Sequence, residues 1–333
     1  MKTCLIRFSG IFVSANNAAL NSAAQIYMAP FQGITGQVFR TCYAKHFSGV
    51  DKLFTPYFAS INNDKRLPER KLKELSHLNE NGIPVIPQIL SKDADEIVRF
   101  AKLVGQLGFT EINWNLGCPY PQVANKKRGS GMLPYPALVA EILEKVFIEI
   151  KINFSVKCRT GYFSPAEIDD LVPVFNRFPL SELIIHPRIG KQLYSGTADP
   201  EKFAHIENQL RMPVVYNGDI FTKNDFDRLQ QKFPSVTHWM IGRGLLSDPF
   251  LPARIKGLAM PADMKKQFRK FIEDLYLAYR RDTNDSLATI GFMKEYWRYL
   301  SESFGDPHKI LKKIKKTRNF DEYEEVVSDI FFE

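Results

Sequence analysis

A cysteine lies in a turn where its side chain could take part in chemistry. The segment NWNLGCPYP places Cys118 between a glycine and a proline, directly after an apolar-alternating stretch that predicts a β-strand. Cys118 is therefore either a small apolar residue at a strand end or a reactive thiol. The other cysteines are distant in the sequence, with no CxxC pair and no Cys/His spacing suited to zinc. This usage predicts a reduced, cytoplasmic protein without a disulfide framework or a metal site.

Polar residues and glycines also follow most of the other apolar runs of the chain. Lys157 comes directly after FSV and His186 directly after ELII, a placement that surface loops alone would not produce. If these runs are parallel strands of a barrel, their carboxyl ends meet at one face. The further residues at such positions are Ala29, Pro30, Gln88, Asn113, Asn115, Arg159, Arg188, Asn217, Gly218, Asp219, Gly242, Arg243 and Gly244.

Two of these segments have the composition of a phosphate site. NGD (217–219) and GRG (242–244) follow the last two apolar runs, where barrels commonly bind phosphate through backbone N–H groups. Arg243 adds a fixed positive charge. The chain has no dinucleotide fingerprint, so bound FMN is favoured over FAD or a permanently bound nicotinamide. Beside a flavin, Lys157 would stabilise negative charge on the reduced ring; otherwise it is a lysine paired with an acid.

The elements that must position these residues repeat one unit: a short apolar run, a turn and an amphipathic helix. Eight strands alternating with helices predict a parallel sheet, and eight is the number that closes a barrel. An open doubly wound sheet would need GxGxxG after its first strand, where MAPFQGITG stands instead. We therefore predict an α/β fold, a (β/α)8 TIM barrel over residues 25–255. The predicted strands are 26–30, 52–58, 84–90, 110–115, 154–159, 182–187, 213–217 and 237–242.

After residue 255 the pattern becomes purely helical and basic. Residues 262–333 predict a second, all-helical domain, joined to the barrel by a linker at 257–261. From Arg254 to Arg318 there are 16 Lys or Arg against 8 Asp or Glu, a local excess of 8. A lysine-rich helix is often only a solvated face, but this concentration, with aromatics nearby, favours a polyanionic partner.

The first 24 residues carry the parts of a secretory signal: a basic start, an apolar stretch and small residues. Arg7 and the pair Ser9-Gly10 interrupt the apolar stretch, so we interpret residues 1–24 as a disordered leader or a start codon placed too early. No apolar run reaches about 18 residues, so no membrane span is expected.

Taken together, the motifs resemble those of the tRNA-dihydrouridine synthases. The matching segments are MAP (28–30), NWNLGCP (113–119), VKCR (156–159), IIHPRIGKQLYSG (184–196), YNGDI (216–220) and MIGRGLLSDPF (240–250). The resemblance runs in order from residue 26 to residue 250. The basic helical region resembles the tRNA-binding region of that family more loosely.

The resemblance implies an FMN-binding barrel that reduces the C5=C6 bond of tRNA uridines with NADPH or NADH. Nothing in the sequence demands more than a monomer. Hydride would pass from flavin N5 to C6, and Cys118 would give a proton to C5. It implies substrate contacts for Asn115, Arg159 and Arg188. The implied flavin contacts are Pro30, Phe31, Gln32, Gln88, Lys157 and His186, and the implied phosphate contacts are Asn217, Gly218, Asp219, Gly242 and Arg243.

The sequence departs from the family at two places, and two other functions are open. Phe31 stands where the family has Met and Gly36 where it has Asp, and the loop GSGMLPYP is looser than usual. None of these changes removes a group that the mechanism needs. One alternative is an FMN barrel acting on a free small molecule, of the dihydroorotate dehydrogenase or ene-reductase type. The other is an RNA-binding protein on an inactive barrel.

Overall fold

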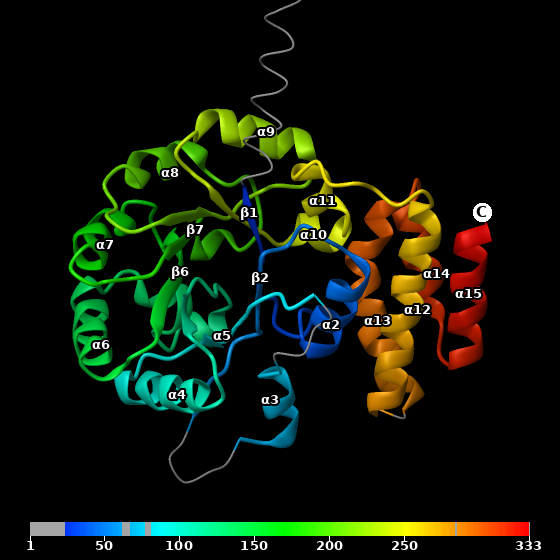
Figure 1. The fold of residues 1–333 in the computed structure, drawn as a ribbon, viewed down its shortest axis with the longest axis horizontal. Coiled ribbons are helices and arrows are strands. Elements are labelled where there is room, and N and C mark those ends of the chain that lie inside the picture. Colours follow the sequence, from blue (N-terminus) through cyan, green and yellow to red (C-terminus); the bar gives the residue numbers. More distant parts are fainter. Residues whose placement is uncertain (1–23, 62–66, 77–80, 284, 333) are drawn as a thin grey trace, which may run out of the picture.

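A computed structural model describes residues 24–61, 67–76, 81–283 and 285–332, so the predicted leader lies outside the described residues except for Ala24. One sheet contains nine strands, and every strand pair in it is parallel (Figure 1). The strands are β1 (Gln25–Met28), β2 (Lys52–Phe54), β3 (Val85–Ile86), β4 (Gln88–Ile89), β5 (Glu111–Leu116), β6 (Asn153–Gly161), β7 (Leu183–Ile189), β8 (Val214–Tyr216) and β9 (His238–Ile241).

Pro87 divides one stave of the sheet into two short strands. Its ring leaves no N–H for the ladder, but its carbonyl accepts a hydrogen bond from the backbone N of Asn113 at 2.9 Å. β3 pairs with β2, and β4 pairs with β5. Since β3 and β4 form the two ends of the sheet and are neighbours in the chain, they act as one stave, and the nine strands close as eight. The predicted TIM barrel is confirmed.

The barrel helices cover the outside of the sheet, as the sequence pattern predicts. Asp93 caps α4 by accepting hydrogen bonds from the backbone N of Asp95 and Glu96. In the described part of the chain, no helix is both long and apolar enough to cross a bilayer. These helices are α2 (Gln37–His46), α3 (Glu69–Glu74), α4 (Ala94–Gln106), α5 (Pro121–Ala124), α6 (Pro136–Glu149), α7 (Glu167–Phe175), α8 (Pro200–Glu207), α9 (Lys223–Lys232), α10 (Arg243–Ser247) and α11 (Leu251–Ile255).

The interior of the barrel is layered, because alternate residues of each strand point to the same face. The middle layer is an apolar cluster separate from the larger core between strands and helices. It contains Tyr27, Phe54, Ile86, Ile184, Val215 and Met240. Two residues further along the strands lie Gln88, His186, Asn217 and Gly242, and on β5 and β6 Asn115 and Lys157 pair with each other. The strand period therefore carries the polar residues of the sequence motifs to the carboxyl end of the interior.

The layer at the amino ends of the strands is an ionic cluster. Lys52 donates to Glu111 at 3.0 Å and to Glu182 at 3.3 Å, and the hydroxyl of Tyr27 donates to Glu182 at 3.0 Å. Burial and the neighbouring Glu111 raise the pKa of the Glu182 carboxyl. These groups close the amino end of the barrel with paired charges, so the barrel opens to a ligand at the other end.

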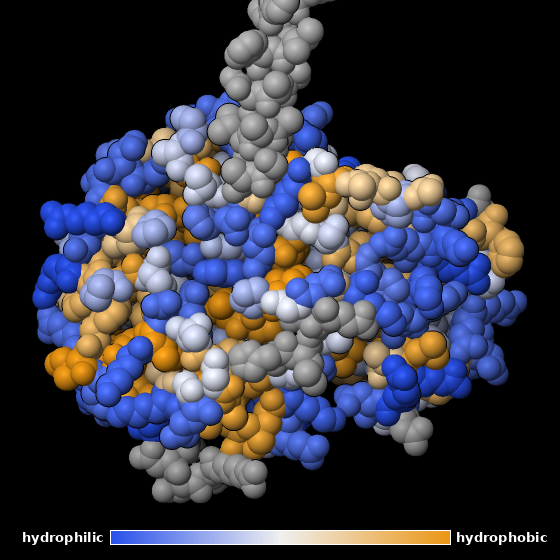
Figure 2. Space-filling view, viewed as in Figure 1, coloured by the Kyte–Doolittle hydropathy of each residue, from blue (hydrophilic) through white to orange (hydrophobic). Residues whose placement is uncertain are grey.

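The C-terminal helices form a bundle that lies against α2 on one side of the barrel (Figure 1). Buried aromatic residues make the contact: Phe271 packs on Phe39 of α2 and on Phe47, the C-cap of that helix, with ring centroids 5.9 and 4.9 Å away. The surface over the bundle is largely hydrophilic (Figure 2). Its helices are α12 (Met264–Thr283), α13 (Ser286–Leu300), α14 (Pro307–Lys316) and α15 (Phe320–Phe332).

Tyr296 of α13 ties the bundle to the barrel by a buried hydrogen bond. Its ring stacks on Phe39 at 5.3 Å, and its hydroxyl lies 2.6 Å from the carbonyl oxygen of Ile34 and 2.7 Å from the hydroxyl of Tyr279. Tyr296 is 1% exposed, so water could not take the place of its hydroxyl if the hydroxyl were removed. The hydroxyl therefore satisfies a backbone carbonyl in the loop before α2.

We expect Tyr296→Phe to lower the free energy of unfolding by about 1–2 kcal/mol, because the shape is kept while a buried carbonyl and hydroxyl lose a partner. Urea denaturation followed by circular dichroism measures the change. Leu287→Ala on the same helix is the control, since Leu287 is 73% exposed and should change stability little. Equal stability of Tyr296→Phe and the parent protein would contradict the role given to this hydroxyl.

Candidate active site

A cavity of about 290 Å³ opens where the carboxyl ends of the strands meet. Its lining brings together the residues that the sequence predicts for the flavin ring, the substrate and the acid: Pro30, Phe31, Gln32, Gln88, Asn115, Cys118, Lys157, Arg159 and His186. A second hollow continues from Lys157 and His186 toward the predicted phosphate residues, Asn217, Gly218, Asp219, Gly242 and Arg243. Of the predicted site residues, only Arg188 lines neither hollow, and it lies behind them.

A chain of buried amides holds the loop that carries Cys118. The side-chain oxygen of Asn115 accepts hydrogen bonds from the backbone N of Gly117 (3.0 Å) and of Cys118 (2.9 Å). The Asn115 amide nitrogen donates to the Gln88 oxygen at 2.7 Å, and the Gln88 nitrogen donates to Asn113 at 2.8 Å. Asn115 accepts hydrogen bonds from the Cys118 turn and donates one to Gln88 on β4. The turn and the two neighbouring strands, β4 and β5, are therefore bonded as one unit.

The glycine-rich loop after α5 closes on Cys118 from the other side. Both the backbone N and the hydroxyl of Ser130 donate to the carbonyl oxygen of Cys118, each at 3.0 Å. Gly129 has φ +56°, and a Cβ there would lie 2.6 Å from the Cys118 carbonyl oxygen and 2.9 Å from its Cβ. Glycine is thus needed at this position for two reasons, a left-handed backbone and a close approach to Cys118.

The Cys118 thiol is held in its protonated form. Its side chain is buried, at 8% exposure, and burial raises the pKa of the thiol, although the charges of Arg159 and Lys157 oppose this shift. A raised pKa means that the thiol keeps its proton at neutral pH. The two cations would stabilise the thiolate once the proton has left, so the site suits proton donation from sulfur.

Arg159 is buried and fastens two loops of the mouth to each other. Its Nε donates to the carbonyl of Gly117 at 3.1 Å, and a terminal nitrogen donates to the carbonyl of Ile189 at 2.8 Å. The guanidinium also lies over the ring of Tyr194, 5.4 Å from its centroid. Burial, with Arg188 nearby, lowers the pKa of Arg159 to about 10, so it stays charged at neutral pH. Arg159 therefore braces the Cys118 turn against the loop after β7.

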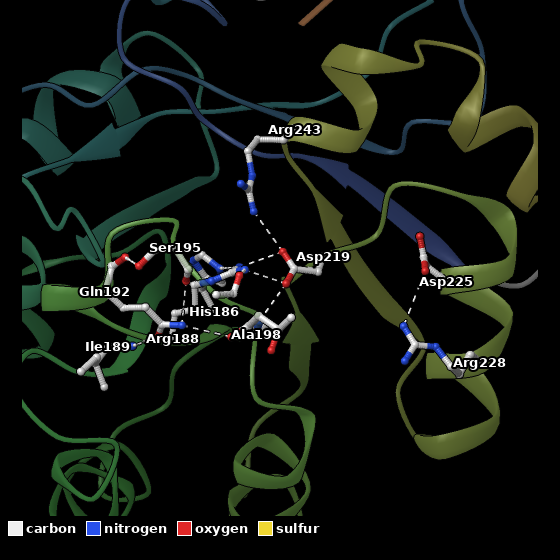
Figure 3. A network of polar contacts seen from close by, with 12 residues as sticks. His186, Arg188, Ile189, Gln192, Ser195, Ala198, Asp219, Asp225, Arg228 and Arg243 are labelled. Atoms are coloured by element: carbon white, nitrogen blue, oxygen red, sulfur yellow. Dashed lines mark hydrogen bonds and ion pairs between the residues drawn. The ribbon is translucent and has the colours of Figure 1, made fainter. Parts of the chain in front are cut away.

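Asp219 is the centre of an arginine network (Figure 3). Arg188 donates to both carboxylate oxygens, at 2.8 and 2.7 Å, and Arg243 donates to one of them at 3.0 Å. The backbone N of Ala198 donates a further bond at 2.7 Å. Although burial opposes it, these bonds lower the pKa of Asp219, which remains ionised. Asp219 also has φ 42°, in the left-handed region that aspartate tolerates better than most residues.

His186 is neutral and Lys157 is only weakly basic. Burial and the surrounding cations lower the pKa of His186 well below its usual value. The Arg188 guanidinium lies 3.1 Å from His186 Nε2 and can only donate, so Nε2 accepts and the ring proton lies on Nδ1. Burial, together with Arg159, lowers the pKa of Lys157 to about 8. An anion bound near Lys157 would restore its basicity.

Gly242 lets the loop after β9 approach the loop after β1. A Cβ at Gly242 would lie 2.9 Å from the ring of Phe31, and one at Gly218 would lie 2.9 Å from the Ala198 side chain. Backbone without side chains therefore lines this end of the hollow, beside the guanidinium of Arg243. This is the arrangement that the NGD and GRG segments predict for a phosphate site.

The helical bundle supplies one wall of the cavity, which sequence reasoning missed. Glu295, Arg298 and Tyr299 of α13 line the mouth opposite Cys118, and Tyr299 lies edge-on to Phe31 with centroids 6.2 Å apart. Their spacing of three and four places them on one helix face, while Tyr296 turns into the core. This spacing was the signal in the sequence that the three residues share a face of the helix. The sequence does not show which face of the helix contacts the barrel.

A larger cleft of about 1080 Å³ continues from this wall between the barrel and the bundle. It shares Arg243, Arg298 and Tyr299 with the two hollows. The other basic residues along it are Arg254, Lys265 and Lys309. Four of the sixteen basic residues between Arg254 and Arg318 thus border this cleft, together with the acidic residues Asp248, Glu302 and Asp306.

A family model described as dihydrouridine synthase matches residues 27–329, nearly the whole described chain. The chain belongs to the dihydrouridine synthase family. It is similar to tRNA-dihydrouridine synthase B of Pasteurella multocida, with 31% identity over 228 residues, 68% of this chain and 67% of that protein. It is also similar to tRNA-dihydrouridine(16) synthase of Cupriavidus necator, with 25% identity over 294 residues, 84% and 91% of the two chains. The predicted family and enzyme class are confirmed.

Solved structures with the same fold belong to proteins of low sequence identity. Histamine dehydrogenase from Rhizobium sp. 4-9 has a TM-score of 0.54 at 13% identity, covering 75% of this chain and 49% of that one. Morphinone reductase has a TM-score of 0.50 at 11% identity, covering 73% and 88%. At such identities the likeness concerns the barrel fold, which this dihydrouridine synthase family member shares with them.

We expect Gly129→Ala to destabilise the protein by roughly 2–4 kcal/mol, because the new methyl group combines a left-handed backbone with overlap on Cys118. Gly257→Ala is the matched control, since Gly257 has φ +65° but no heavy atom within 4 Å of the added Cβ. It should cost only about 1–2 kcal/mol. Free energies of unfolding from urea titrations compare the two. Equal costs would mean that the close approach of the loop to Cys118 contributes nothing.

Proposed function

We propose that this protein reduces the C5=C6 bond of uridines in tRNA to dihydrouridine, with bound FMN as cofactor and NADPH or NADH as the reductant. The observation that carries the proposal is the position of the buried, protonated Cys118 thiol. It lines the first cavity, and the second hollow that continues from this cavity is lined by arginine and glycine backbone. Membership of the family and relatives named tRNA-dihydrouridine synthase support it.

The residues of the cavity fit a flavin mononucleotide. Four cationic side chains line the two hollows, Lys157, Arg159, Arg243 and Arg298, against the carboxylates of Asp219 and Glu295, which leaves an excess of positive charge for a phosphate. The neutral His186 and the weakly basic Lys157 would face the ring. When bound, FMN would supply the hydride that is added to C6 of the target uracil.

Cys118 would supply the matching proton to C5. The amide chain through Asn115 and the two bonds from Ser130 fix the backbone from which the thiol extends. Loss of the proton leaves a thiolate, which Arg159 and Lys157 stabilise by their charge. A proton from solvent must then restore the thiol before the next turnover. Proton donation from a positioned group of this kind contributes about 100- to 10,000-fold in rate.

Asp219 and Arg188 would act indirectly, by holding neighbouring side chains in position. A carboxylate would repel the phosphate, so we assign Asp219 to holding Arg243 in place beside it. The Arg188 side chain is 1% exposed and bonded to Asp219, Gly196 and His186, so we assign it to fixing Asp219 and the His186 tautomer. Arg159, with both bonds on backbone carbonyls, would position the Cys118 turn.

The RNA would enter past the helical bundle. A uridine within a folded RNA is stacked, so it has to leave its neighbours before its ring can reach Cys118 at the base of the cavity. The cleft between barrel and bundle presents Lys265, Arg298 and Lys309 for the phosphates of the strand that remains outside, while Arg254 is bonded to Asp248. Affinity for tRNA should therefore fall as the salt concentration rises.

The proposal is tested by incubating the protein with FMN, NADPH and unmodified tRNA and measuring dihydrouridine in the digested nucleosides by mass spectrometry. Cys118→Ala should lower the rate of product formation by about 100-fold or more while FMN binding persists. Cys42→Ala, which removes another buried thiol from α2, is the matched control and should keep its rate. Normal turnover in Cys118→Ala would exclude the thiol as the acid.

Absence of product in the parent protein, with reduction of a free pyrimidine or another small alkene instead, would favour the small-molecule enzyme.

The affinity of the apoprotein for FMN should depend on pH through Lys157. Its pKa of about 8 means that the charged form dominates below pH 8 and is lost as pH rises through that value. The dissociation constant for FMN, measured by quenching of flavin fluorescence, should change little between about pH 7 and 7.5, where the phosphate of FMN is already doubly ionised, and rise above about pH 8. In Lys157→Met the affinity should be weaker and this rise absent. The same rise in that variant would assign the titration to another group.

A further inference from the structure

The exposed aromatic side chains of the described residues are gathered at one end of the barrel. Among the large hydrophobic side chains that are exposed, the aliphatic ones are scattered, with Ile148 on α6, Leu277 on α12 and Leu287 on α13. Of the exposed aromatic ones, all but Phe332 lie on loops that follow the carboxyl ends of β5, β6 and β8. These rim aromatics are Tyr120, Tyr135, Phe163 and Phe221.

Two of the rim aromatics are tyrosines held between prolines. Tyr120 lies in CPYP and Tyr135 in LPYP, and each is the N-cap of a helix that begins with the following proline. Proline fixes its own φ and keeps the residue before it out of the helical region. Both tyrosines are therefore held on a stiff backbone, although their rings are 47% and 38% exposed.

The loop that carries Phe163 is also held rigid, in this case by hydrogen bonds to a carboxylate. The Glu167 carboxylate accepts hydrogen bonds from three successive backbone N–H groups, those of Tyr162 (2.7 Å), Phe163 (3.0 Å) and Ser164 (3.0 Å). The ring of Phe163 lies edge-on to Tyr162, with centroids 4.7 Å apart, and is 60% exposed. A rigid loop that exposes a phenyl ring loses little entropy when the ring binds a partner.

Three of the rim aromatics are paired with a cation. Lys127 lies over the ring of Tyr135 at 4.2 Å from its centroid, and Lys191 over that of Phe163 at 5.6 Å. Arg243 lies over the ring of Phe221 at 5.3 Å. Lys127 and Lys191 are themselves exposed, so each can meet a phosphate while the neighbouring ring meets a base.

The rim is also continuous with the catalytic turn. The ring of Tyr162 packs against Gly190, where an added Cβ would overlap it and would lie 2.6 Å from the Ser130 hydroxyl. That hydroxyl donates to the carbonyl of Cys118. A base stacked at the loop after β6 would therefore lie beside the mouth that leads to the thiol.

We propose that the rim aromatics are stacking positions for unpaired bases of the RNA on either side of the target uridine. The proposal rests on the proposed function for the identity of that RNA. Separate rings, three of them with a cation and all of them on loops of the rim, suit the nucleotides of a single strand, since every base has a face to stack. A protein partner would instead favour one contiguous apolar patch with a central anchor.

The test measures tRNA affinity by fluorescence anisotropy for the full-length protein and three variants. Phe163→Leu and Tyr135→Leu keep apolar bulk but remove the aromatic face, and each should raise the dissociation constant about fivefold or more. Ile148→Ala is the matched control, because Ile148 is 83% exposed on α6 and should leave affinity unchanged. An RNA duplex without unpaired bases serves as a second probe, whose weak binding the leucine variants should not alter.

Salt dependence separates stacking from charge. Lys191→Met should reduce the slope of log affinity against log salt by about 0.7–0.9, the value of one phosphate contact, whereas Phe163→Leu should shift the line without changing its slope. Parent-like affinity of both leucine variants would overturn the proposal and leave the rings to another partner. Equal weakening of duplex and tRNA binding would also overturn it.

The outcome is distinguishable from failure of the proposed function. If the parent protein makes dihydrouridine while the leucine variants bind tRNA normally, only the stacking role falls. If it makes none but binds an unstructured oligouridine in a manner that depends on Phe163 and Tyr135, only the catalytic proposal falls. If it binds no RNA, both fall. Thermal unfolding of each variant verifies that the loop substitutions leave the barrel folded.

Discussion

The period of two along parallel strands is the constraint on which the rest of the structure depends. Once eight staves close, each strand delivers every second side chain to one shared interior, and the layers follow from the sequence spacing. Ile184 and His186 show the principle on one strand: the first seals the apolar layer and the second reaches the cavity. A shift of one residue in any strand would exchange a functional side chain for one of the outer core.

Much of this could be predicted from the sequence because the signals are local. The strands and the polar residues after the apolar runs are each indicated by the types of a few neighbouring residues. The interruption at Pro87 was not predicted, since an apolar run with one proline is also consistent with a continuous stave. The bonds of Arg159 to Gly117 and Ile189 join segments about 30 to 40 residues apart, and only the closed barrel brings them together. The periodicity of apolar residues does not predict which residues distant in the sequence form hydrogen bonds with each other.

The helical bundle illustrates a further limit of local reasoning. Its amphipathic pattern separates a buried face from an exposed one, but Tyr299 belongs to neither, since it is half-buried against Phe31 of the barrel. That position depends on how α12 and α13 dock on α2 through Phe39 and Tyr296. The docking thus decides the shape of the mouth, and the basic cleft beside it, without any residue of α2 entering the cavity.

The interruption at Pro87 leaves one stave of the barrel with two short strands in place of one longer strand. β3 and β4 contribute two residues each to the ladders, whereas β6 contributes nine. Segments with few backbone bonds open locally at a lower free energy than the whole molecule. Gln88 lies on this stave and bonds to Asn115, so such opening reaches the Cys118 turn. A local opening of this stave would therefore loosen the end of the cavity that holds Cys118, while the end at Asp219 would keep its bonds to Arg188 and Arg243.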